Sequence, residues 1–215
     1  MLDKLTQKSY RPLTRDFFDR DAVWVAKALL GHWLIYQPAD NAQTLVAFQI
    51  VETEAYRQDD PACHAYGKTT GRAANLYESP GTAYVYLIYG MYYCLNVVCE
   101  PKGVGAAVLF RALEPFGETI PPFKTHGPGR LCKALGINKA HNGIDLTDAK
   151  SPLYLAQNPK AKALCSNSII TTTRVGISQA QGHLWRFYLR QSPYVSSRDK
   201  KAELALSERA LQKKK

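Results

Sequence analysis

The segment Thr82–Cys99 limits the possible folds most strongly, because it is apolar over two strand lengths and contains neither proline nor lysine. It also holds five of the chain's 13 tyrosines. Before Gly90, apolar side chains occur at both odd-numbered and even-numbered positions, as expected for a strand that is covered on both faces. We therefore predict a core β-hairpin that turns at Gly90-Met91.

The predicted turn carries large side chains at a place where small polar residues are usual. Tyr89 precedes Gly90, and Met91 and Tyr92 follow it. Exposed aromatic side chains at the tip of a hairpin are typical of a wedge or of a surface that stacks on bases. The sequence therefore predicts a functional hairpin tip rather than a simple reversal of the chain.

Composition limits the number of domains and the kind of partner. A chain of 215 residues with 46% hydrophobic content can build one substantial core and does not require a second domain. The net charge of +10 favours an anionic partner, either nucleic acid or an anionic membrane surface, and charge does not choose between them. The polar N-terminus and the lack of an uninterrupted apolar run of about 18 residues predict neither a signal peptide nor a membrane span.

The five cysteines include no CxxC pair and do not cluster with the five histidines. This spacing favours neither a disulfide framework nor a zinc site. We expect the cysteines to be reduced and buried, which indicates a cytoplasmic protein.

Hydrophobic periodicity outlines the remaining elements. Asp19 or Asp21 can cap a helix over residues 22–30, and Gly31 stands where a helix stop belongs. Strands are predicted over residues 32–37, 45–54, 106–113, 153–155, 169–173 and 185–190, and further helices over 130–137 and 204–215.

The other segments lack such periodicity. Residues 55–80 are predicted to form a long loop, a kind of segment that often carries function. We expect a flexible basic N-terminus over residues 1–11, a single domain over 12–200 and a basic C-terminal tail over 201–215.

Two carboxylates stand at the end of the strand predicted over residues 45–54. Glu52 and Glu54 are poor core material, because burying an unpaired ion costs free energy. They share one parity, so the pattern does not tell which of them faces a pocket. Solvated charges at a strand edge are an equally good explanation.

Three more polar residues interrupt or adjoin apolar segments, namely His64, Asn96 and Arg111. A buried amide needs hydrogen-bond partners, and a buried guanidinium needs an anion. Each residue taken singly is better explained as a satisfied structural group. Together with the glutamates, they look like the wall of one site. Residues 127–130 precede a predicted helix, so free N–H groups and Arg130 could hold a phosphate, although ordinary helix entry explains them as well.

Several motifs, in the same order along the chain, resemble the alkyladenine (3-methyladenine) DNA glycosylase family. They are Ile50–Tyr56, the PACHAY segment with His64, Gly81–Val98, Val108–Pro115, Gly127–Lys139 and Arg186–Ser196. The resemblance extends from about Arg11 to Arg198. Thr70–Tyr77 departs from the family pattern, because Ala73 follows Arg72 where the family has an Arg-Asn pair, and Leu76-Tyr77 replace Met-Phe.

The resemblance implies a mixed α/β (α+β) fold: a single domain with a curved antiparallel sheet, a protruding β-hairpin and surrounding helices. It implies a monofunctional DNA repair glycosylase with no metal and no organic cofactor. The substrates would be alkylated or deaminated purines in double-stranded DNA, such as 3-methyladenine, 7-methylguanine, hypoxanthine and ethenoadenine. No lysine matches a Schiff-base nucleophile, so the abasic product would remain uncut. We expect a monomer with no membrane contact, located at the nucleoid if the source is bacterial.

The family's functional residues match positions in this chain. Glu54 matches the general base that activates water, and Arg111 would place that water or the adjacent phosphate. The extruded base would lie between Tyr56 on one face and His64 with Tyr86 on the other.

Further matches concern selectivity and DNA contact. Asn96 would exclude the 2-amino group of guanine, and Tyr89 would fill the gap left by the flipped nucleotide. Met91 and Tyr92 would help part the strands, and Arg130 and Lys139 would contact the DNA backbone.

Two other functions fit parts of the pattern. A non-catalytic nucleic-acid-binding module would use the tyrosines only to stack bases. A hydrolase of free nucleosides would use the same polar residues, but it would not need the net charge or the exposed hairpin tip.

Overall fold

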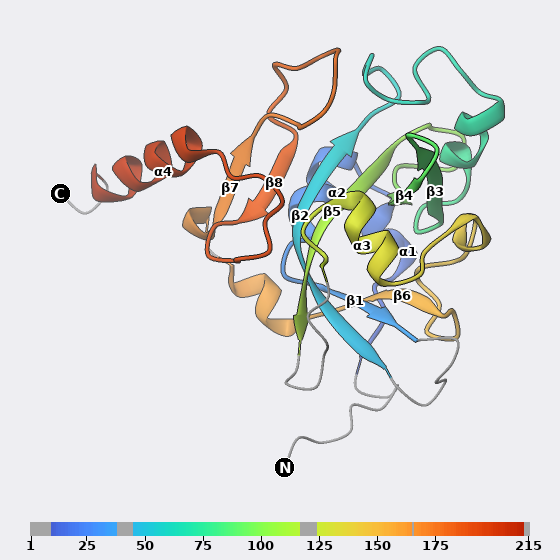
Figure 1. The fold of residues 1–215 in the computed structure, drawn as a ribbon, viewed down its shortest axis with the longest axis horizontal. Helices are drawn as coiled ribbons and strands as arrows, with labels where there is room; N and C mark the ends of the chain where they lie inside the picture. Colours follow the sequence, from blue (N-terminus) through green and yellow to red (C-terminus); the bar gives the residue numbers. More distant parts are fainter. Residues whose placement is uncertain (1–9, 38–44, 117–123, 165, 213–215) are drawn as a thin grey trace.

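The computed structural model describes residues 10–37, 45–116, 124–164 and 166–212, and its elements are labelled in Figure 1. The helices are α1 (Arg15–Phe18), α2 (Ala22–Ala28), α3 (Pro128–Ala134) and α4 (Lys200–Gln212). The strands are β1 (Trp33–Tyr36), β2 (Val46–Tyr56), β3 (Ala83–Ile88), β4 (Tyr92–Val98), β5 (Ala107–Phe116), β6 (Leu153–Ala156), β7 (Ile169–Thr172) and β8 (Arg186–Leu189). Short 3-10 helices lie between them at Gly71–Tyr77, Lys139–His141, Pro159–Ala163 and Ser166–Ser168.

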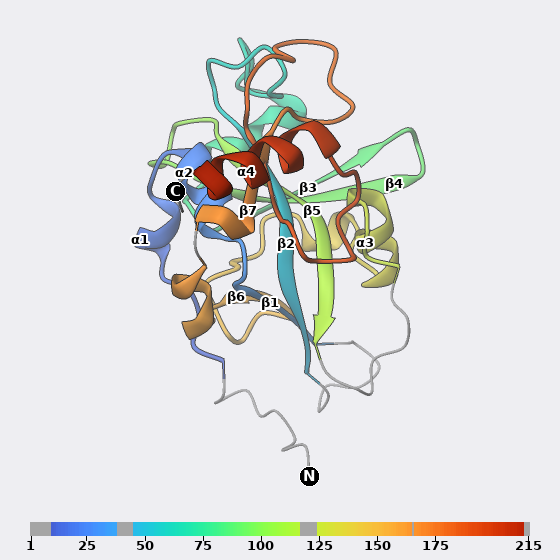
Figure 2. The ribbon, with the colours of Figure 1, turned by 90° about the vertical axis from the view of Figure 1, so that its left-hand side faces the viewer.

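The strands form one antiparallel sheet that branches at β2. Its main path runs β3-β4-β5-β2-β1-β6, and β8 joins β2 to β7. β2 pairs with β5 along one edge, while its other edge pairs first with β1 and then with β8. The sheet therefore curls around the core, as Figures 1 and 2 show. The prediction of a mixed α/β fold with a curved antiparallel sheet is confirmed.

The pairing of β2 with β5 is interrupted near its middle. Thr53 pairs with Phe110 and Glu52 pairs with Ala112, so Arg111 is an extra residue on β5. A second shift lies between Ile50 and Glu52. Such β-bulges bend a strand and re-aim its side chains, and they are frequent beside active sites.

Helix α2 covers one face of this sheet. Its first N–H groups are capped as predicted, because the Asp21 carboxylate accepts hydrogen bonds from the backbone of Val23 and Trp24. The Thr53 hydroxyl donates to the Ala26 carbonyl at 2.7 Å, so this β2 side chain points at the helix. Side chains alternate along a strand, which places those of Glu52 and Glu54 on the opposite face.

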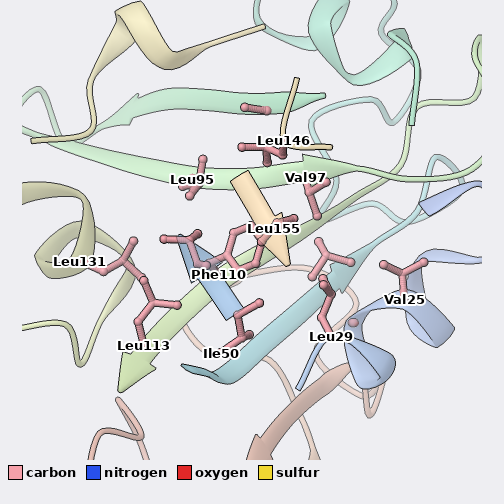
Figure 3. Close-up of a cluster of buried hydrophobic side chains, with 14 of the residues drawn as sticks. Val25, Leu29, Ile50, Leu95, Val97, Phe110, Leu113, Leu131, Leu146 and Leu155 are labelled. Carbon is pink, nitrogen blue, oxygen red and sulfur yellow. The ribbon is translucent and has the colours of Figure 1, made fainter. Parts of the chain in front are cut away.

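The hydrophobic core lies between α2, α3 and the sheet. Figure 3 shows Val25 of α2 and Leu29, which caps the end of α2, at one end of this cluster and Leu131 of α3 at the other. Ile50 and Phe110 lie between them, and all five side chains are completely buried. The core therefore leaves the opposite face of β2 and β5 free for polar groups.

The predicted hairpin is present as β3 and β4, and Figure 2 shows it projecting from the body beside α3. Its turn is centred one residue earlier than the sequence suggested, on Tyr89 and Gly90, with Met91 N–H donating to Ile88 O at 3.3 Å. Tyr89 and Gly90 both have positive φ, 54° and 69°. A tyrosine in this left-handed region is strained, a feature that clusters at functional sites.

Other boundaries differ by a few residues. The short helix α1 was not foreseen, and α4 begins at Lys200 rather than at residue 204. α4 extends outward from the body (Figure 1), but the Tyr188 hydroxyl holds its first turn by donating to Glu203 at 2.9 Å. Within the described residues, no helix combines the length and the apolarity needed to cross a membrane.

Some sequence predictions fall outside the described residues. They concern the first nine residues of the basic N-terminus, the turn over 38–43, Cys165 and the final three lysines. The other four cysteines, Cys63, Cys94, Cys99 and Cys132, are free and buried as predicted.

Candidate active site

Glu52 and Glu54 are both completely buried, so neither is a solvated charge at a strand edge. Because they alternate with Thr53, both carboxylates lie on the face of β2 that α2 does not cover. The structure separates the two residues by their partners, which the sequence pattern could not do.

Glu52 is surrounded by structural partners. One oxygen accepts hydrogen bonds from Arg111 Nε at 3.1 Å and from Arg186 Nη1 at 2.9 Å. The other accepts from the backbone N–H of Ser196 at 2.6 Å. This carboxylate thus joins β2 to β5, to β8 and to the segment before α4, and its charge is compensated by two arginines.

Glu54 has a different environment. Its Oε1 accepts a hydrogen bond from the backbone N–H of Val175 at 2.8 Å and lies 3.2 Å from Arg111 Nη1. Its Oε2 accepts from the Tyr56 hydroxyl at 2.9 Å. All three partners line a cavity, so Glu54 stands directly behind the cavity wall.

This cavity has a volume of about 480 Å³, within the usual range for a small-molecule site. It lies between the β3–β4 hairpin, β5, the loop before His64, the start of α3 and the loop after β7. Its polar and aromatic lining residues are Tyr56, His64, Tyr84, Tyr86, Tyr89, Tyr92, Asn96, Arg111, Ser178 and Gln179. Most of the predicted site is therefore brought together, although its members come from distant parts of the chain.

Tyr56 forms one side of the cavity. Its ring lies 4.7 Å from the Arg174 guanidinium, measured from the carbon atom to the ring centroid. Burial and the neighbouring Glu54 carboxylate raise the pKa of Tyr56. The hydroxyl therefore stays protonated and donates a hydrogen bond to Glu54.

His64 and Tyr86 form the facing aromatic group. Their ring centroids are 4.6 Å apart in an edge-to-face arrangement. His64 Nδ1 lies 2.8 Å from the Tyr84 hydroxyl. Burial lowers the His64 pKa, and the positive charges of Arg72 and Lys68 lower it further, so the imidazole is neutral at pH 7.

Asn96 and Arg111 complete the polar wall. Asn96 is buried and donates from Nδ2 to the Tyr84 carbonyl at 3.0 Å, which fixes its amide plane. Burial is the largest single influence and opposes the charged form of Arg111, but the attraction of Glu54 and Glu52 and the other favourable interactions together outweigh it and raise the pKa of Arg111. Arg111 is therefore a permanent cation between the two carboxylates.

The remaining predicted residues are on the surface. Tyr89 is 79% exposed at the hairpin tip, and both Tyr89 and Tyr92 reach the cavity mouth. Met91 is exposed beside them but does not line the cavity. Arg130 on α3 and Lys139 are also exposed and lie outside the cavity lining.

Several residues of the site were not foreseen from the sequence. Arg174 and Asp60 form a buried ion pair beside Tyr56, and Tyr84 holds both His64 and Asn96. The loop Val175–Gln179 supplies a whole wall of the cavity. Only Arg174 left a trace in the sequence, as a charged residue directly after the strand predicted over residues 169–173. Among the described residues, His, Cys, Asp and Glu side chains form no group of three that could hold a metal ion.

Comparison with known proteins decides which family this geometry belongs to. The profile of the methylpurine-DNA glycosylase (MPG) family matches residues 16–193. The chain belongs to this family. Membership confirms the resemblance seen in the sequence and the prediction of a monofunctional DNA glycosylase, a hydrolase of DNA repair whose substrate is DNA.

Several other proteins are similar to this chain over most of its length. A protein of Methanocella arvoryzae is 45% identical over 202 residues, which cover 86% of this chain and 96% of the relative. A protein of Desulfitobacterium hafniense is 42% identical over 207 residues, with 86% and 98% covered, and one of Carboxydothermus hydrogenoformans is 42% identical over 197 residues, with 86% and 99% covered. All three carry the name "Putative 3-methyladenine DNA glycosylase".

Proposed function

We propose that this glycosylase rotates a damaged purine out of duplex DNA into the aromatic cavity, where Glu54 activates a water that hydrolyses the N-glycosidic bond. The substrates are alkylated and deaminated purines, including 3-methyladenine, 7-methylguanine, hypoxanthine and ethenoadenine. The product is an abasic site. The enzyme acts as a monomer on double-stranded DNA.

The observation that carries the proposal is the environment of Glu54. Its carboxylate is completely buried and is held by Val175 N–H, by Arg111 and by the Tyr56 hydroxyl. A carboxylate held in this way beside a cavity is preorganised both to take a proton from water and to stabilise positive charge developing on a sugar. Glu52 lacks this position: of the partners of its carboxylate, Arg111, Arg186 and the Ser196 N–H, only Arg111 lines the cavity.

The aromatic groups suit the base. Tyr56 and the pair His64 with Tyr86 offer surfaces on which a flat purine can stack. A cationic alkylated purine gains additional attraction from aromatic faces, and the neutral His64 does not repel it. Asn96 has a fixed amide plane, so it can act as a rigid steric gate against a 2-amino group.

The hairpin suits a duplex. Chemistry on a base inside a stack requires that the nucleotide be turned out and the gap be filled. Tyr89 is strained, exposed and located at the cavity mouth, and Met91 and Tyr92 widen the same tip. The exposed cations Arg130 and Lys139 would contact phosphates on the flanking backbone.

The reaction then needs a water held next to the anomeric carbon and a base that takes its proton. Arg111, at 3.2 Å from Glu54, can orient the water or the adjacent phosphate, and Glu54 takes the proton as water attacks the anomeric carbon. A cationic base leaves with little proton donation. No lysine lines the cavity among the described residues, so the base is released without a covalent amine intermediate on the sugar.

The test is single-turnover excision from lesion-containing duplexes by the wild type and by Glu54→Gln. Excision by the variant should fall by about 10²–10⁴-fold, while its affinity for the same duplexes is retained. Near-normal excision by Glu54→Gln would refute the role of this carboxylate. A parallel series with 3-methyladenine, 7-methylguanine, hypoxanthine and ethenoadenine defines the substrate range.

Two controls separate the other functions. A wild-type protein that binds these duplexes and excises nothing would be a non-catalytic binding module. Release of the base from a free nucleoside at the rate found for the duplex would indicate a nucleoside hydrolase. Light scattering of the free protein tests whether it is a monomer.

A further inference from the structure

Arg174 is a buried arginine to which the proposed mechanism gives no task. It lies between β7 and the cavity-lining loop Val175–Gln179. Its side chain and that of Asp60 are both completely buried and form an ion pair. Asp60 lies in the turn after β2, on the way to His64.

Arg174 and the residue after it contact three successive residues of β2. The Val175 N–H donates to Glu54 Oε1 at 2.8 Å. Arg174 Nη1 donates to the Ala55 carbonyl at 2.9 Å, and the guanidinium lies over the Tyr56 ring. The proposed base and the proposed stacking surface are thus both held from the same point of the chain.

The Asp60 carboxylate extends this support to the opposite wall. Arg174 donates to both of its oxygens, through Nη1 to Oδ2 and through Nη2 to Oδ1 at 3.0 Å. Asp60 in turn accepts the N–H of Ala62 on its side chain at 3.0 Å and the N–H of Cys63 on its carbonyl at 2.8 Å. These residues directly precede His64, so the turn that presents His64 is fastened to Arg174.

The same guanidinium holds the far end of the cavity loop. Arg174 Nη2 lies 3.5 Å from the Ala180 carbonyl, and Ala180 has a positive φ of 49°, which is unusual for a residue with a side chain. The Trp185 ring covers the guanidinium, whose carbon atom lies 5.1 Å from the ring centroid. Figures 1 and 2 show the loop after β2 and the loop between β7 and β8 at the same end of the molecule.

We propose that Arg174, with Asp60 as its counter-ion, is a positioning residue that sets the distance between Glu54, Tyr56 and the His64 turn. This inference rests on the function proposed above. It assigns to Arg174 no contact with the reacting atoms. Its effect on the reaction passes through the backbone N–H of Val175 and the ring of Tyr56.

The physical case lies in geometry more than in stability. A buried ion pair adds little net stability, because the cost of removing two ions from water offsets their attraction. What only arginine supplies is a planar fork that bonds a carboxylate with two nitrogens and a carbonyl with one, while its face covers an aromatic ring. A lysine would keep the charge and lose both the fork and the plane.

Arg174→Lys is therefore the test, and Arg15→Lys is its matched control. Arg15 also bonds one carboxylate and one carbonyl, with Nη2 at 2.6 Å from Asp145 and Nη1 at 2.5 Å from the Pro80 oxygen, but it does not line the cavity. Both variants keep the positive charge and lose the planar guanidinium. Only Arg174→Lys removes support from Glu54 and Tyr56.

Two measurements are made on the full chain at a temperature well below both unfolding midpoints. In single-turnover excision from a lesion duplex, Arg174→Lys should be slower by about 30- to 100-fold, the scale of a displacement near 1 Å, while the Kd for that duplex changes little. In amide hydrogen exchange followed by NMR, the Val175 N–H should exchange at least about tenfold faster. Arg15→Lys should leave both quantities at the wild-type level.

The outcomes separate the two proposals. If the Val175 N–H of Arg174→Lys exchanges at the wild-type rate, the positioning role is overturned. The positioning role would also be overturned if Arg174→Lys and Arg15→Lys lost excision activity to the same extent for the same loss of stability. If the wild type excises no lesion, the proposed function fails, and the exchange of Val175 still decides whether Arg174 holds that amide.

Discussion

The Tyr56 hydroxyl donates a hydrogen bond of 2.9 Å to the carboxylate of Glu54. This bond joins the residue proposed to stack on the base to the residue proposed to activate water. Both are completely or largely buried, and the bond lies along the wall of the cavity. Several of the outcomes expected from mutation follow from this arrangement.

Tyr56→Phe keeps the stacking ring and removes only the hydroxyl. A hydrogen bond to a charged acceptor is worth about 1.5–3 kcal/mol, so single-turnover excision should fall by at least about tenfold. Tyr86→Phe is the matched control, because the hydrogen-bond partner of the Tyr86 hydroxyl is Cys94 rather than Glu54. Equal rates for the two variants would show that the bond to Glu54 does not matter for the reaction.

Tyr89→Asn should make the protein more stable and less active. Asn-Gly is the preferred pair for a turn with positive φ at both central positions, so relief of strain should raise Tm by a few degrees. Loss of the aromatic tip should slow excision from a duplex far more than from a single strand. Tyr89→Phe, which keeps the ring, should excise normally, and an unchanged duplex rate for Tyr89→Asn would count against the wedge.

Asn96→Ala should weaken selectivity. The fixed amide of Asn96 lines the cavity, and removing it opens space for the 2-amino group of guanine. Release of undamaged guanine should rise by about 10-fold or more, the scale set by a steric contact in a pocket. Asn142→Ala, which removes an acceptor for Val85 N–H outside the cavity lining, is the control and should leave guanine release at background.

Arg130→Ala and Lys139→Ala test the DNA footprint. Each should weaken binding to lesion and undamaged duplexes alike and reduce the slope of log K against log salt by about one. Lys27→Ala removes the same charge from α2, on the face opposite Glu54, and should leave the slope unchanged. A slope that is flat in the wild type would contradict the role of the basic surface.

The lowered pKa of His64 should appear as a pH dependence of stability. Burial and the charges of Arg72 and Lys68 hold this pKa below the unfolded value of about 6.5. The unfolded chain therefore binds a proton first as pH falls, and stability present above that value is lost as pH falls through the folded pKa. Calorimetry between pH 8 and 5 should show a shallower loss of Tm in His64→Gln, and parallel curves would contradict the shift.

The fold was largely predictable from the sequence because its elements are encoded locally. The apolar run around Gly90 identified the hairpin, and the Asp21 cap with the following helical pattern identified α2. The turn was misplaced by one residue, because propensity does not anticipate a tyrosine with positive φ. Strain of this kind is maintained by its surroundings.

Part of the candidate site was predictable from the sequence, but its arrangement was not. Glu54, Tyr56, His64, Tyr86, Asn96 and Arg111 do converge at one cavity or its wall. The different environments of Glu52 and Glu54 could not be predicted from two residues on the same face of a strand. Arg186 and the Ser196 N–H hold Glu52, whereas the Val175 N–H and the Tyr56 hydroxyl hold Glu54 beside the cavity.

The sequence by itself determined the hairpin, its aromatic tip, the excess of positive charge and the family to which the chain belongs, since these depend on composition and on the order of side chains within short motifs. Only the tertiary structure decided which carboxylate stands at the cavity and which residues hold it there. The buried ion pairs in and around the cavity wall join residues far apart in the sequence: Arg111–Glu52, Arg174–Asp60 and Arg186–Glu52 span 59, 114 and 134 positions. Their geometry depends on sheet register and bulges, and a local pattern carries no record of either.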